Sequence, residues 1–351
     1  MKRVSNMKSL VSILIPAFNA EKWIAETLES AIGQTWERKE IIVVDDGSSD
    51  QTLAIARQFS SKGVSIVTQE NQGAAAARNK AFSLSKGDYI QWLDADDLLA
   101  PDKITRQMGV AEEYGNPRML LSSAWGRFIY RSSRAEFSPT GLWCDLSPVE
   151  WLLRKIGHNL HMQTATWLVS RHLTEAAGPW NTNLLGDDDG EYFCRVLLSS
   201  DGIRFVQEAR VIYRMSGVNS LSYIGRSDRK KEAQFLSMKL HIEYLRSLEE
   251  SDRVRAACVR YLQTWMICFY PDRLDIVKEA EQIAVGLGGQ LVIPSLSWKY
   301  AWIQKVFGWS LAKRVQTLLS KYKWSMVRSW DKALFRLESR SDVSPENGGC
   351  Q

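Results

Sequence analysis

The first hundred residues alternate between short apolar runs and stretches with a helical spacing of apolar positions. The runs at residues 11–15, 41–45, 64–68 and 89–93 have the length and β-branched content of buried strands. Between them, apolar residues recur every three or four positions, and an alanine-rich stretch spans residues 73–84. This strand–helix repetition predicts an α/β fold with a mostly parallel sheet flanked by helices.

Ligands of such sheets bind outside the carboxyl ends of the strands. That rule selects four short loops, at residues 16–19, 45–48, 68–71 and 94–97. Three of them are rich in polar or acidic residues. We therefore expect the binding site at this edge of the sheet.

The remaining chain is less regular, then strongly helical. A helix is expected at residues 192–198, and strands at residues 164–170 and 209–214. Helical spacing dominates from about residue 226. We predict a catalytic domain over residues 1–225, a helical region over residues 226–340 and a disordered tail over residues 341–351.

Three acidic clusters are the main candidates for chemistry. Asp94, Asp96 and Asp97 follow the fourth expected strand, and carboxylates two residues apart can converge on Mg²⁺ or Mn²⁺. The alternative is an acidic turn that caps the next helix. Asp45 and Asp46 follow the second expected strand, where a carboxylate can accept hydrogen bonds from a nucleotide or simply shape a turn.

The third cluster places four carboxylates within residues 187–191. Crowding raises the pKa of carboxyl groups unless a cation or donor lies among them, and one could then serve as a general base. The alternative is a solvated acidic loop. Arg78 could reach a phosphate or lie on the surface of its helix. His158 and His161 have no third metal-ligand type nearby, which favours a polar or core role over a metal site.

Composition narrows the class of protein further. The 351 residues carry 45 basic and 40 acidic side chains, a net charge of +5, with 45% hydrophobic residues. These values argue against a disordered chain or a coiled coil, and the charge is too small to indicate nucleic acid. Five scattered cysteines without a C-x-x-C pair fit a reducing cytoplasm. We expect no signal peptide or spanning helix, and no P-loop, G-x-G-x-x-G or G-x-S-x-G motif is present.

Together, three segments resemble the inverting family 2 glycosyltransferases of the GT-A fold. The first is VSILIPAFNAEKWIAETLESAIGQTWERKEIIVVDDGSSDQT, the second is NQGAAAARNKAFSLSKGDYIQWLDADDLLAPDKI, which contains a DxD motif, and the third is GDDDGEYFCRV. The match is close over residues 9–105 and looser to about residue 222. In the third segment Asp188 stands where Glu is more usual. Ser216 stands where many members have a His after Tyr-Arg.

The resemblance implies a role for each matching position. Asp189 would be the general base, Asp46 would bind the base of the nucleotide, and Asp94 and Asp96 would hold a divalent cation, Mn²⁺ or Mg²⁺. Asp97, Asp188, Glu191 and His161 would contact the acceptor or support the site. The nucleotide-sugar pocket would include Pro16, Ala17, Phe18, Asn19, Asp46, Gly73, Arg78, Asp94, Ala95, Asp96 and Arg214.

The implied activity is transfer of a sugar from a nucleotide-diphosphate sugar to a hydroxyl of a glycan or lipid-linked glycan. UDP is common in the family, while dTDP and GDP stay open. Two alternatives remain. One is a nucleotidyltransferase, which fits less well because its Gly- and Arg-rich phosphate loop is missing. The other is an inactive nucleotide-sugar-binding or scaffold protein, against which the intact Asp96 and Asp189 argue.

The C-terminal segment between residues 298 and 337 differs from the rest in charge. It has nine basic residues against Asp331 alone, a balance of +8, and five tryptophans. A basic amphipathic helix rich in Trp is typical of contact with an anionic membrane. The alternative is a helix packed on the catalytic domain with a solvated basic face. We expect a cytoplasmic protein without a nucleic-acid partner, and on the membrane interpretation it makes peripheral contact with the inner face of the cytoplasmic membrane.

Overall fold

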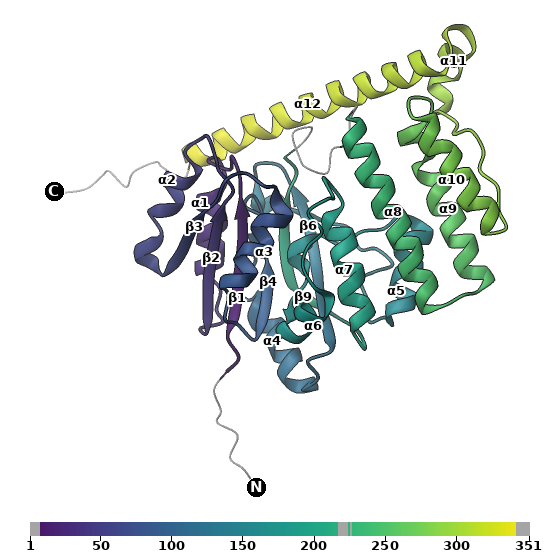
Figure 1. Cartoon of the computed structure of the whole chain (residues 1–351). Helices are drawn as coiled ribbons and strands as arrows, with labels where there is room; N and C mark the ends of the chain where they lie inside the picture. The colour runs from purple at the N-terminus through teal and green to yellow at the C-terminus, as the bar shows by residue number, and fades with distance from the viewer. Residues whose placement is uncertain (1–7, 217–223, 225–226, 342–351) are drawn as a thin grey trace.

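The computed structural model describes residues 8–216, 224 and 227–341. Its main sheet contains β1 (Val11–Ala17), β2 (Lys39–Asp45), β3 (Val64–Thr68), β4 (Tyr89–Trp92) and β8 (Val169–Ser170). The order is β3-β2-β1-β4-β8, with the first four strands parallel and β8 antiparallel to β4 (Figure 1). All seven residues of β1 are buried, so both faces of the sheet centre are covered. The four predicted strands are confirmed.

The helices that follow these strands also match the sequence pattern. They are α1 (Ile24–Ile32), α2 (Thr52–Arg57), α3 (Ala74–Leu84) and, after the acidic turn, α4 (Lys103–Tyr114). Gly73 precedes α3 with φ of 91°, a conformation that glycine adopts without strain. Helix α3 contacts β1 and β2, which fixes the side chains of its first turns beside the carboxyl edge of the sheet.

A second sheet forms from segments that the sequence pattern left mostly unassigned. Its order is β5 (Leu98–Leu99), β9 (Gly202–Arg214), β6 (Met119–Phe128) and β7 (Glu136–Phe137). Strands β6 and β9 are parallel, and their register shifts between Ser123 and Ala124. The expected strand at residues 209–214 is the end of β9. Strand β5 comes directly after residues 94–97 and thereby ties the acidic turn to β9.

The expectation of one strand over residues 164–170 is wrong. Thr164–Thr166 form a 3₁₀ turn, and only Val169–Ser170 are extended, as β8. The Gln163 side chain accepts a hydrogen bond from the Ala165 N–H at 2.6 Å, and the Thr166 hydroxyl donates to the Gln163 carbonyl at 2.6 Å. These local bonds compete with the strand ladder that the apolar run would otherwise favour.

Three helices lie between the two sheets and the C-terminal region. They are α5 (Pro148–His158), α6 (Arg171–Ala177) and α7 (Asp188–Ser199). Helix α7 contains the expected helix at residues 192–198 and begins four residues earlier than its apolar pattern, with acids in its first turn. Acidic side chains are favourable at a helix N-terminus because of the helix dipole.

The C-terminal region contains α8 (Asp228–Leu248), α9 (Asp252–Phe269), α10 (Leu274–Gly286), α11 (Ala301–Phe307) and α12 (Trp309–Ser341). Helices α8 and α9 pack against α5, and α8 also packs against α7. One cluster of buried apolar residues therefore runs from Val11 to Leu287, on both sides of the boundary expected near residue 225. The predicted tail covers residues 341–351: Ser341 is the last residue of α12, and residues 342–351 lie outside the described residues.

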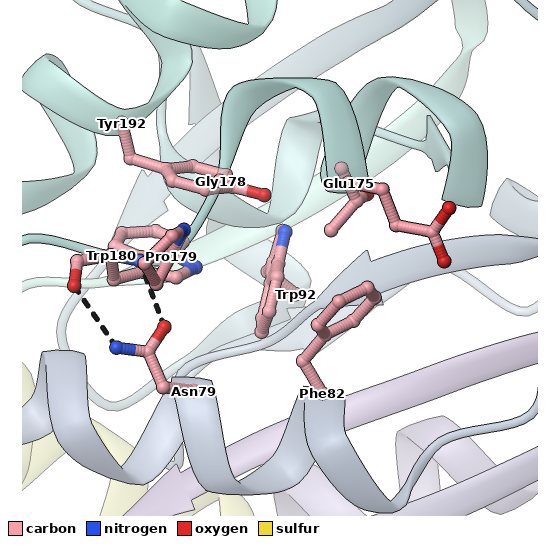
Figure 2. A pocket seen from close by; sticks show the side chains of 9 residues that line it. Asn79, Phe82, Trp92, Glu175, Gly178, Pro179, Trp180 and Tyr192 are labelled. Carbon is pink, nitrogen blue, oxygen red and sulfur yellow. Dashed lines mark hydrogen bonds between the residues drawn. The ribbon is translucent and has the colours of Figure 1, made fainter.

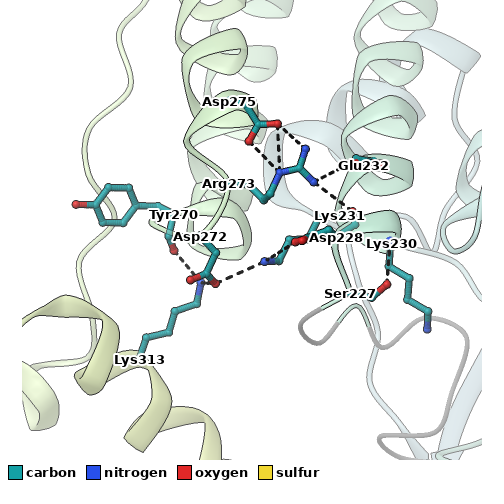
Figure 3. Close-up of polar contacts among 10 residues, drawn as sticks. All are labelled: Ser227, Asp228, Lys230, Lys231, Glu232, Tyr270, Asp272, Arg273, Asp275 and Lys313. Carbon is teal, nitrogen blue, oxygen red and sulfur yellow. Dashed lines mark hydrogen bonds and ion pairs between the residues drawn. The ribbon is translucent and has the colours of Figure 1, made fainter.

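Helix α12 returns from this region across the edge of the molecule toward the main sheet (Figure 1). Near its start, Lys313 donates to the Tyr270 carbonyl at 2.7 Å, and Asp272 lies between Lys313 and Lys231 (Figure 3). Near its end, Asp331 accepts hydrogen bonds from the Tyr130 N–H at 2.9 Å and from Arg131 at 2.8 Å. Over the described residues, none of the helices has the length and apolar character required to cross a bilayer.

Candidate active site

The centre of the site is the acidic turn between β4 and β5. Asp94 and Asp96 are half-buried, Ala95 and Asp97 are buried, and the Asp97 N–H closes the turn on the Asp94 carbonyl at 3.1 Å. The turn lies at the carboxyl end of β4, where the sequence placed it. The two halves of the DxD motif therefore keep partly accessible carboxylates, while the third acid points into the protein.

Arg78 joins two of the predicted acidic clusters. Its guanidinium pairs with Asp94 at 2.7 Å and with Asp188 at 2.6 Å, and it packs over the Trp180 ring at 4.4 Å. The Arg78 side chain is buried; burial disfavours its charge, yet Asp188 and Asp94 raise its pKa. The alternative of an arginine on the surface of its helix is therefore wrong, because α3 turns this side chain toward the sheet edge.

The carboxylates of Asp94 and Asp96 repel each other. Burial and the neighbouring Asp94 carboxylate raise the pKa of Asp96 to about 6, although Arg214 opposes the shift. Over the described part of the chain, no three His, Cys, Asp or Glu side chains are grouped as a complete metal site. Two carboxylates nevertheless fit Mg²⁺ or Mn²⁺, because such ions take their remaining ligands from water and substrate phosphates.

The buried Asp97 carboxylate holds neighbouring segments together. Its carboxylate accepts hydrogen bonds from the Gln163 side chain and, at 2.8 Å, from the Arg214 N–H. Burial and the neighbouring Asp96 and Asp94 raise its pKa well above the usual range. Asp97 thus connects the turn to β9 and to the loop before the 3₁₀ turn, rather than facing the open side of the site.

Arg214 lies beneath the same turn and is 1% exposed. It donates to the Asp96 carbonyl at 2.9 Å and pairs with Glu26 at 2.5 Å. Its guanidinium lies 4.1 Å from the Trp23 ring centroid and 4.3 Å from that of Phe128. The family resemblance placed Arg214 in the nucleotide pocket. In the structure its guanidinium is fully engaged by these contacts, so it would have to break them to bind a phosphate.

The third acidic cluster opens α7. Asp189 is half-buried and accepts a hydrogen bond from the Thr164 hydroxyl at 3.3 Å. Burial and the carboxylates of Asp188 and Asp187 raise its pKa to about 7. Asp187 precedes the helix and accepts from Ser237 of α8 at 2.6 Å. The cluster is therefore built into the fold, and the alternative of a solvated acidic loop is wrong.

Glu191 points away from this group. Its buried carboxylate binds Arg195 through two hydrogen bonds, at 2.6 and 2.9 Å, and accepts from the Tyr244 hydroxyl at 2.8 Å. The residue therefore connects α7 to α8 and supports the position of Asp189. His161, also predicted in a supporting role, is exposed, and its ring centroid lies 5.2 Å from that of Trp125.

The second acidic cluster shapes the loop before α3. The Asp46 carboxylate accepts hydrogen bonds from the Gln69 side chain at 2.8 Å and from the Gln72 and Gly73 N–H groups at 2.9 and 2.8 Å. Its neighbour Asp45 is buried, and its Oδ1 has no hydrogen-bond partner among the described residues.

The loop after β1 completes the predicted pocket. Pro16 and Ala17 are buried in β1, whereas Phe18 is half exposed. Asn19 adopts φ of 48°, and its side chain accepts a hydrogen bond from the Ser49 N–H at 2.9 Å. The loops after β1 and β2 are thus joined directly, as expected for strands that are neighbours in the sheet.

A separate cavity of about 300 Å³ lies between α3, β4, α6 and α7 (Figure 2). Phe82, Trp92, Trp180 and Tyr192 line it, and none of its lining residues is a predicted site residue. Trp180 stacks on Tyr192 with ring centroids 4.0 Å apart, and the Arg78 guanidinium packs on the Trp180 ring. The cavity therefore lies behind the acidic cluster, on the aromatic wall that supports it.

Sequence reasoning missed several residues that build the site. Gln163 and Thr164 bind Asp97 and Asp189, and Trp180 supports Arg78. Trp23 and Glu26 hold Arg214. The first three lie where the resemblance is loose, and their types carry no motif. The available signal was the pair Gln163-Thr164 beside an apolar run, where two polar residues need partners once buried.

Comparisons with known proteins identify what the chain is similar to. Residues 12–122 match the model of the family described as glycosyl transferase family 2. A putative teichuronic acid biosynthesis glycosyltransferase of Bacillus subtilis, TuaG, is 39% identical over 108 residues, which cover 30% of this chain and 43% of TuaG. The UDP-Glc:alpha-D-GlcNAc-diphosphoundecaprenol beta-1,3-glucosyltransferase WfgD of Escherichia coli is 35% identical over 128 residues, covering 34% of this chain and 51% of WfgD. The matched part is therefore about half or less of either relative.

Among solved structures, residues 1–349 of TarS from S. aureus in complex with UDP-GlcNAc superpose with a TM-score of 0.65. The match covers 81% of this chain and 82% of the TarS chain at 17% sequence identity, which shows a shared fold. Residues 12–122 thus match glycosyl transferase family 2, and the fold of the chain is the GT-A fold with a C-terminal helical region.

Proposed function

We propose that this chain is an inverting glycosyltransferase that uses a nucleotide-diphosphate sugar, with UDP as the first nucleotide to test. The observation that carries the proposal is the pairing of Arg78 with both Asp94 and Asp188. It brings the turn that would hold the diphosphate beside the helix start that would supply the base. Two acidic groups separated by 94 positions in sequence thereby become one site.

Asp189 has the properties of the general base. Burial and its acidic neighbours raise its pKa to about 7, so its carboxylate is a stronger proton acceptor than an ordinary aspartate. The acceptor oxygen forms the new bond to the anomeric carbon, its proton passes to Asp189, and the bond to the diphosphate oxygen breaks. The diphosphate leaves with the bonding electrons, and one displacement inverts the anomeric centre.

Asp96 and Asp94 would hold a divalent cation, Mn²⁺ or Mg²⁺. When bound, the cation supplies charge stabilisation for the leaving diphosphate. The raised pKa of Asp96 supports this assignment, because a nearby positive charge would relieve the repulsion between the two carboxylates. Asp46 and Asn19 shape the loops around the nucleotide through their hydrogen bonds, and Phe18 remains available for contact with it.

The acceptor class is proposed from the relatives. The name of WfgD specifies a diphosphoundecaprenol-linked sugar, and that of TuaG specifies teichuronic acid biosynthesis. We propose a hydroxyl of a glycan or lipid-linked glycan as the acceptor here. The proposed location is cytoplasmic, with peripheral contact at the inner face of the cytoplasmic membrane.

The test is Asp189→Asn, with Asp102→Asn as the control. Asp102 is an exposed acid in an ion pair with Arg106, so its loss tests only a change of charge. Nucleotide sugars are first screened by thermal shift with Mn²⁺ and Mg²⁺, and transfer is then measured with the best donor. We expect Asp189→Asn to bind the donor normally and to lose transfer by about 10²- to 10⁴-fold. Unchanged transfer would remove Asp189 as the base, and donor binding without any turnover in the wild type would favour the inactive binding protein.

A further inference from the structure

Helix α12 has a row of large apolar side chains that the rest of the protein leaves exposed. The row, here called the α12 outer face, consists of Leu318, Tyr322, Met326, Trp330 and Leu337. These residues are 64, 67, 58, 69 and 62% exposed. Their spacing of four or seven residues places them on one side of the helix.

The opposite side of α12 is already packed on the protein. Trp309 donates to the Pro294 carbonyl at 3.0 Å and packs edge-on against Tyr270, with ring centroids 5.0 Å apart. Farther along, Phe335 lies 6.2 Å from the Tyr130 ring, centroid to centroid. The sequence left a choice between a packed helix and a membrane-binding one, and the structure shows that packing uses one side and leaves the outer face exposed.

The acidic side chains of α12 lie on its protein side, and exposed basic side chains lie on its outer side. The two acidic side chains described in α12, Asp331 and Glu338, both pair with Arg131 on the protein side, at 2.8 and 3.0 Å. Other basic residues of the C-terminal segment are exposed, among them Lys299, Lys305, Arg314, Lys323 and Arg336. The side of α12 away from the protein is therefore apolar along its centre and basic at its margins.

We propose that the α12 outer face lies in the interface of an anionic lipid bilayer, with the helix parallel to the membrane plane. A helix of this kind buries its apolar stripe at the boundary of headgroups and acyl chains, and its basic residues attract anionic lipids. A second copy of the chain fits less well, because symmetric pairing would bring two basic margins together. An anionic bilayer would bury the apolar side chains of the α12 outer face and would also attract the basic residues beside them.

The placement has a consequence for the active site, which rests on the proposed function. Arg328 lies close to Tyr130, whose ring centroid is 5.7 Å from that of Trp23. The Arg214 guanidinium packs on the Trp23 ring, 4.1 Å from its centroid, and donates a hydrogen bond to the Asp96 carbonyl. A membrane-bound α12 would therefore hold the site at a fixed distance from the bilayer, within reach of a lipid-linked acceptor.

The experiment is flotation of the full chain with vesicles of phosphatidylcholine alone or mixed equally with phosphatidylglycerol. We expect binding to the anionic vesicles only, weakened by salt. The variant Tyr322→Ser/Met326→Ser/Trp330→Ser should lower partitioning by about tenfold or more. The variant Arg314→Glu/Lys323→Glu/Arg336→Glu should do the same at low salt. The control Val285→Ser/Val292→Ser/Ile293→Ser removes apolar residues that are 64–67% exposed outside α12, and it should bind like the wild type.

Equal partitioning of the apolar-row variant and the wild type would overturn the proposal. So would loss of a wild-type oligomer in that variant, seen by sedimentation equilibrium, since that result assigns the face to a second copy. Donor binding in solution, measured in parallel, should be unchanged in all three variants and shows that they are folded. Vesicle binding by Asp189→Asn separates the two proposals, because it should persist whether or not Asp189 is the base.

Discussion

The acidic site and helix α12 solve opposite electrostatic problems. In the site, Asp94 and Asp188 are drawn inward and share the buried Arg78. In α12, the acids are turned inward to Arg131 and exposed basic residues remain outside. Charges that are buried must be paired, so losing one partner is costly, whereas exposed charges contribute little to stability and remain available for binding. The two regions should therefore respond very differently to the loss of one charge.

Arg78→Met should have the largest effect on stability. It removes the guanidinium between the Asp94 and Asp188 carboxylates and leaves both without their charged partner. We therefore expect the free energy of unfolding to fall by about 3 to 5 kcal/mol. Urea denaturation measures it, with Arg106→Met as the control. Arg106 forms an exposed pair with Asp102, and its loss should cost at most about 0.5 kcal/mol. Equal effects of the two variants would break the comparison.

The pH dependence of transfer should be strong and opposite in sign to that of stability. The pKa of Asp189 is raised to about 7, so kcat/KM should fall about tenfold for each pH unit below that value as the base becomes protonated. The raised pKa also means that the protonated form stabilises the fold at low pH. This contribution is lost as pH rises through about 7.

Two series of measurements check this prediction. One is kcat/KM against pH, and the other is the urea midpoint of wild type and Asp189→Asn against pH. The variant should lack the part of the stability change that Asp189 causes. A flat kcat/KM profile below pH 7 would contradict the role of Asp189 as the base.

Tyr244→Phe should have a moderate effect, because it removes one hydrogen bond between α8 and the active-site helix. The Tyr244 hydroxyl donates to Glu191 at 2.8 Å, and Glu191 keeps Arg195 when it is lost. We expect a loss of about 1 kcal/mol in the free energy of unfolding, with donor binding unchanged. Tyr114→Phe, at an exposed tyrosine, is the control and should be neutral. A neutral Tyr244→Phe would show that α8 does not support α7 through this contact.

Asp331→Ala should have the smallest global effect. It removes the acceptor for the Tyr130 N–H and for Arg131 at a partly exposed site, so we expect less than about 1 kcal/mol. Local opening should increase, and hydrogen exchange should be faster in the last turns of α12 than in α8. Ser329→Ala on the same helix is the control. Unchanged exchange in α12 would mean that its end is held by other contacts.

The first half of the α/β architecture was predictable because its signal is local. The runs at β1 to β4 alternate with helical spacing, and a parallel sheet follows from that order. Strand β6 was not predicted, since its pairing with β9 joins segments about eighty residues apart and buries Ser122 and Ser123. The 3₁₀ turn at residues 164–166 depends on side-chain hydrogen bonds from Gln163 and Thr166 that an apolar run does not reveal.

The site divides in the same way. Its acidic residues were visible as clusters at strand ends, yet the clusters do not say which carboxylates face a ligand. In the tertiary structure, Asp97 points inward and accepts hydrogen bonds from Gln163 and Arg214. The Asp46 carboxylate accepts hydrogen bonds from the loop before α3. It also shows Arg78 between Asp94 and Asp188, a contact that no spacing within the sequence encodes.

By itself, the sequence determined the order of strands and helices in the first hundred residues, the acidic character of the sheet edge and the two-sided character of α12. These properties depend on the period of apolar residues and on the types of neighbouring side chains. Only the tertiary structure decided which side of α12 packs, through contacts such as that of Asp331 with Arg131, two hundred positions away. Such contacts depend on how distant elements pack and on which buried charges must be paired, so the fold determines where each surface of the protein is left free to bind.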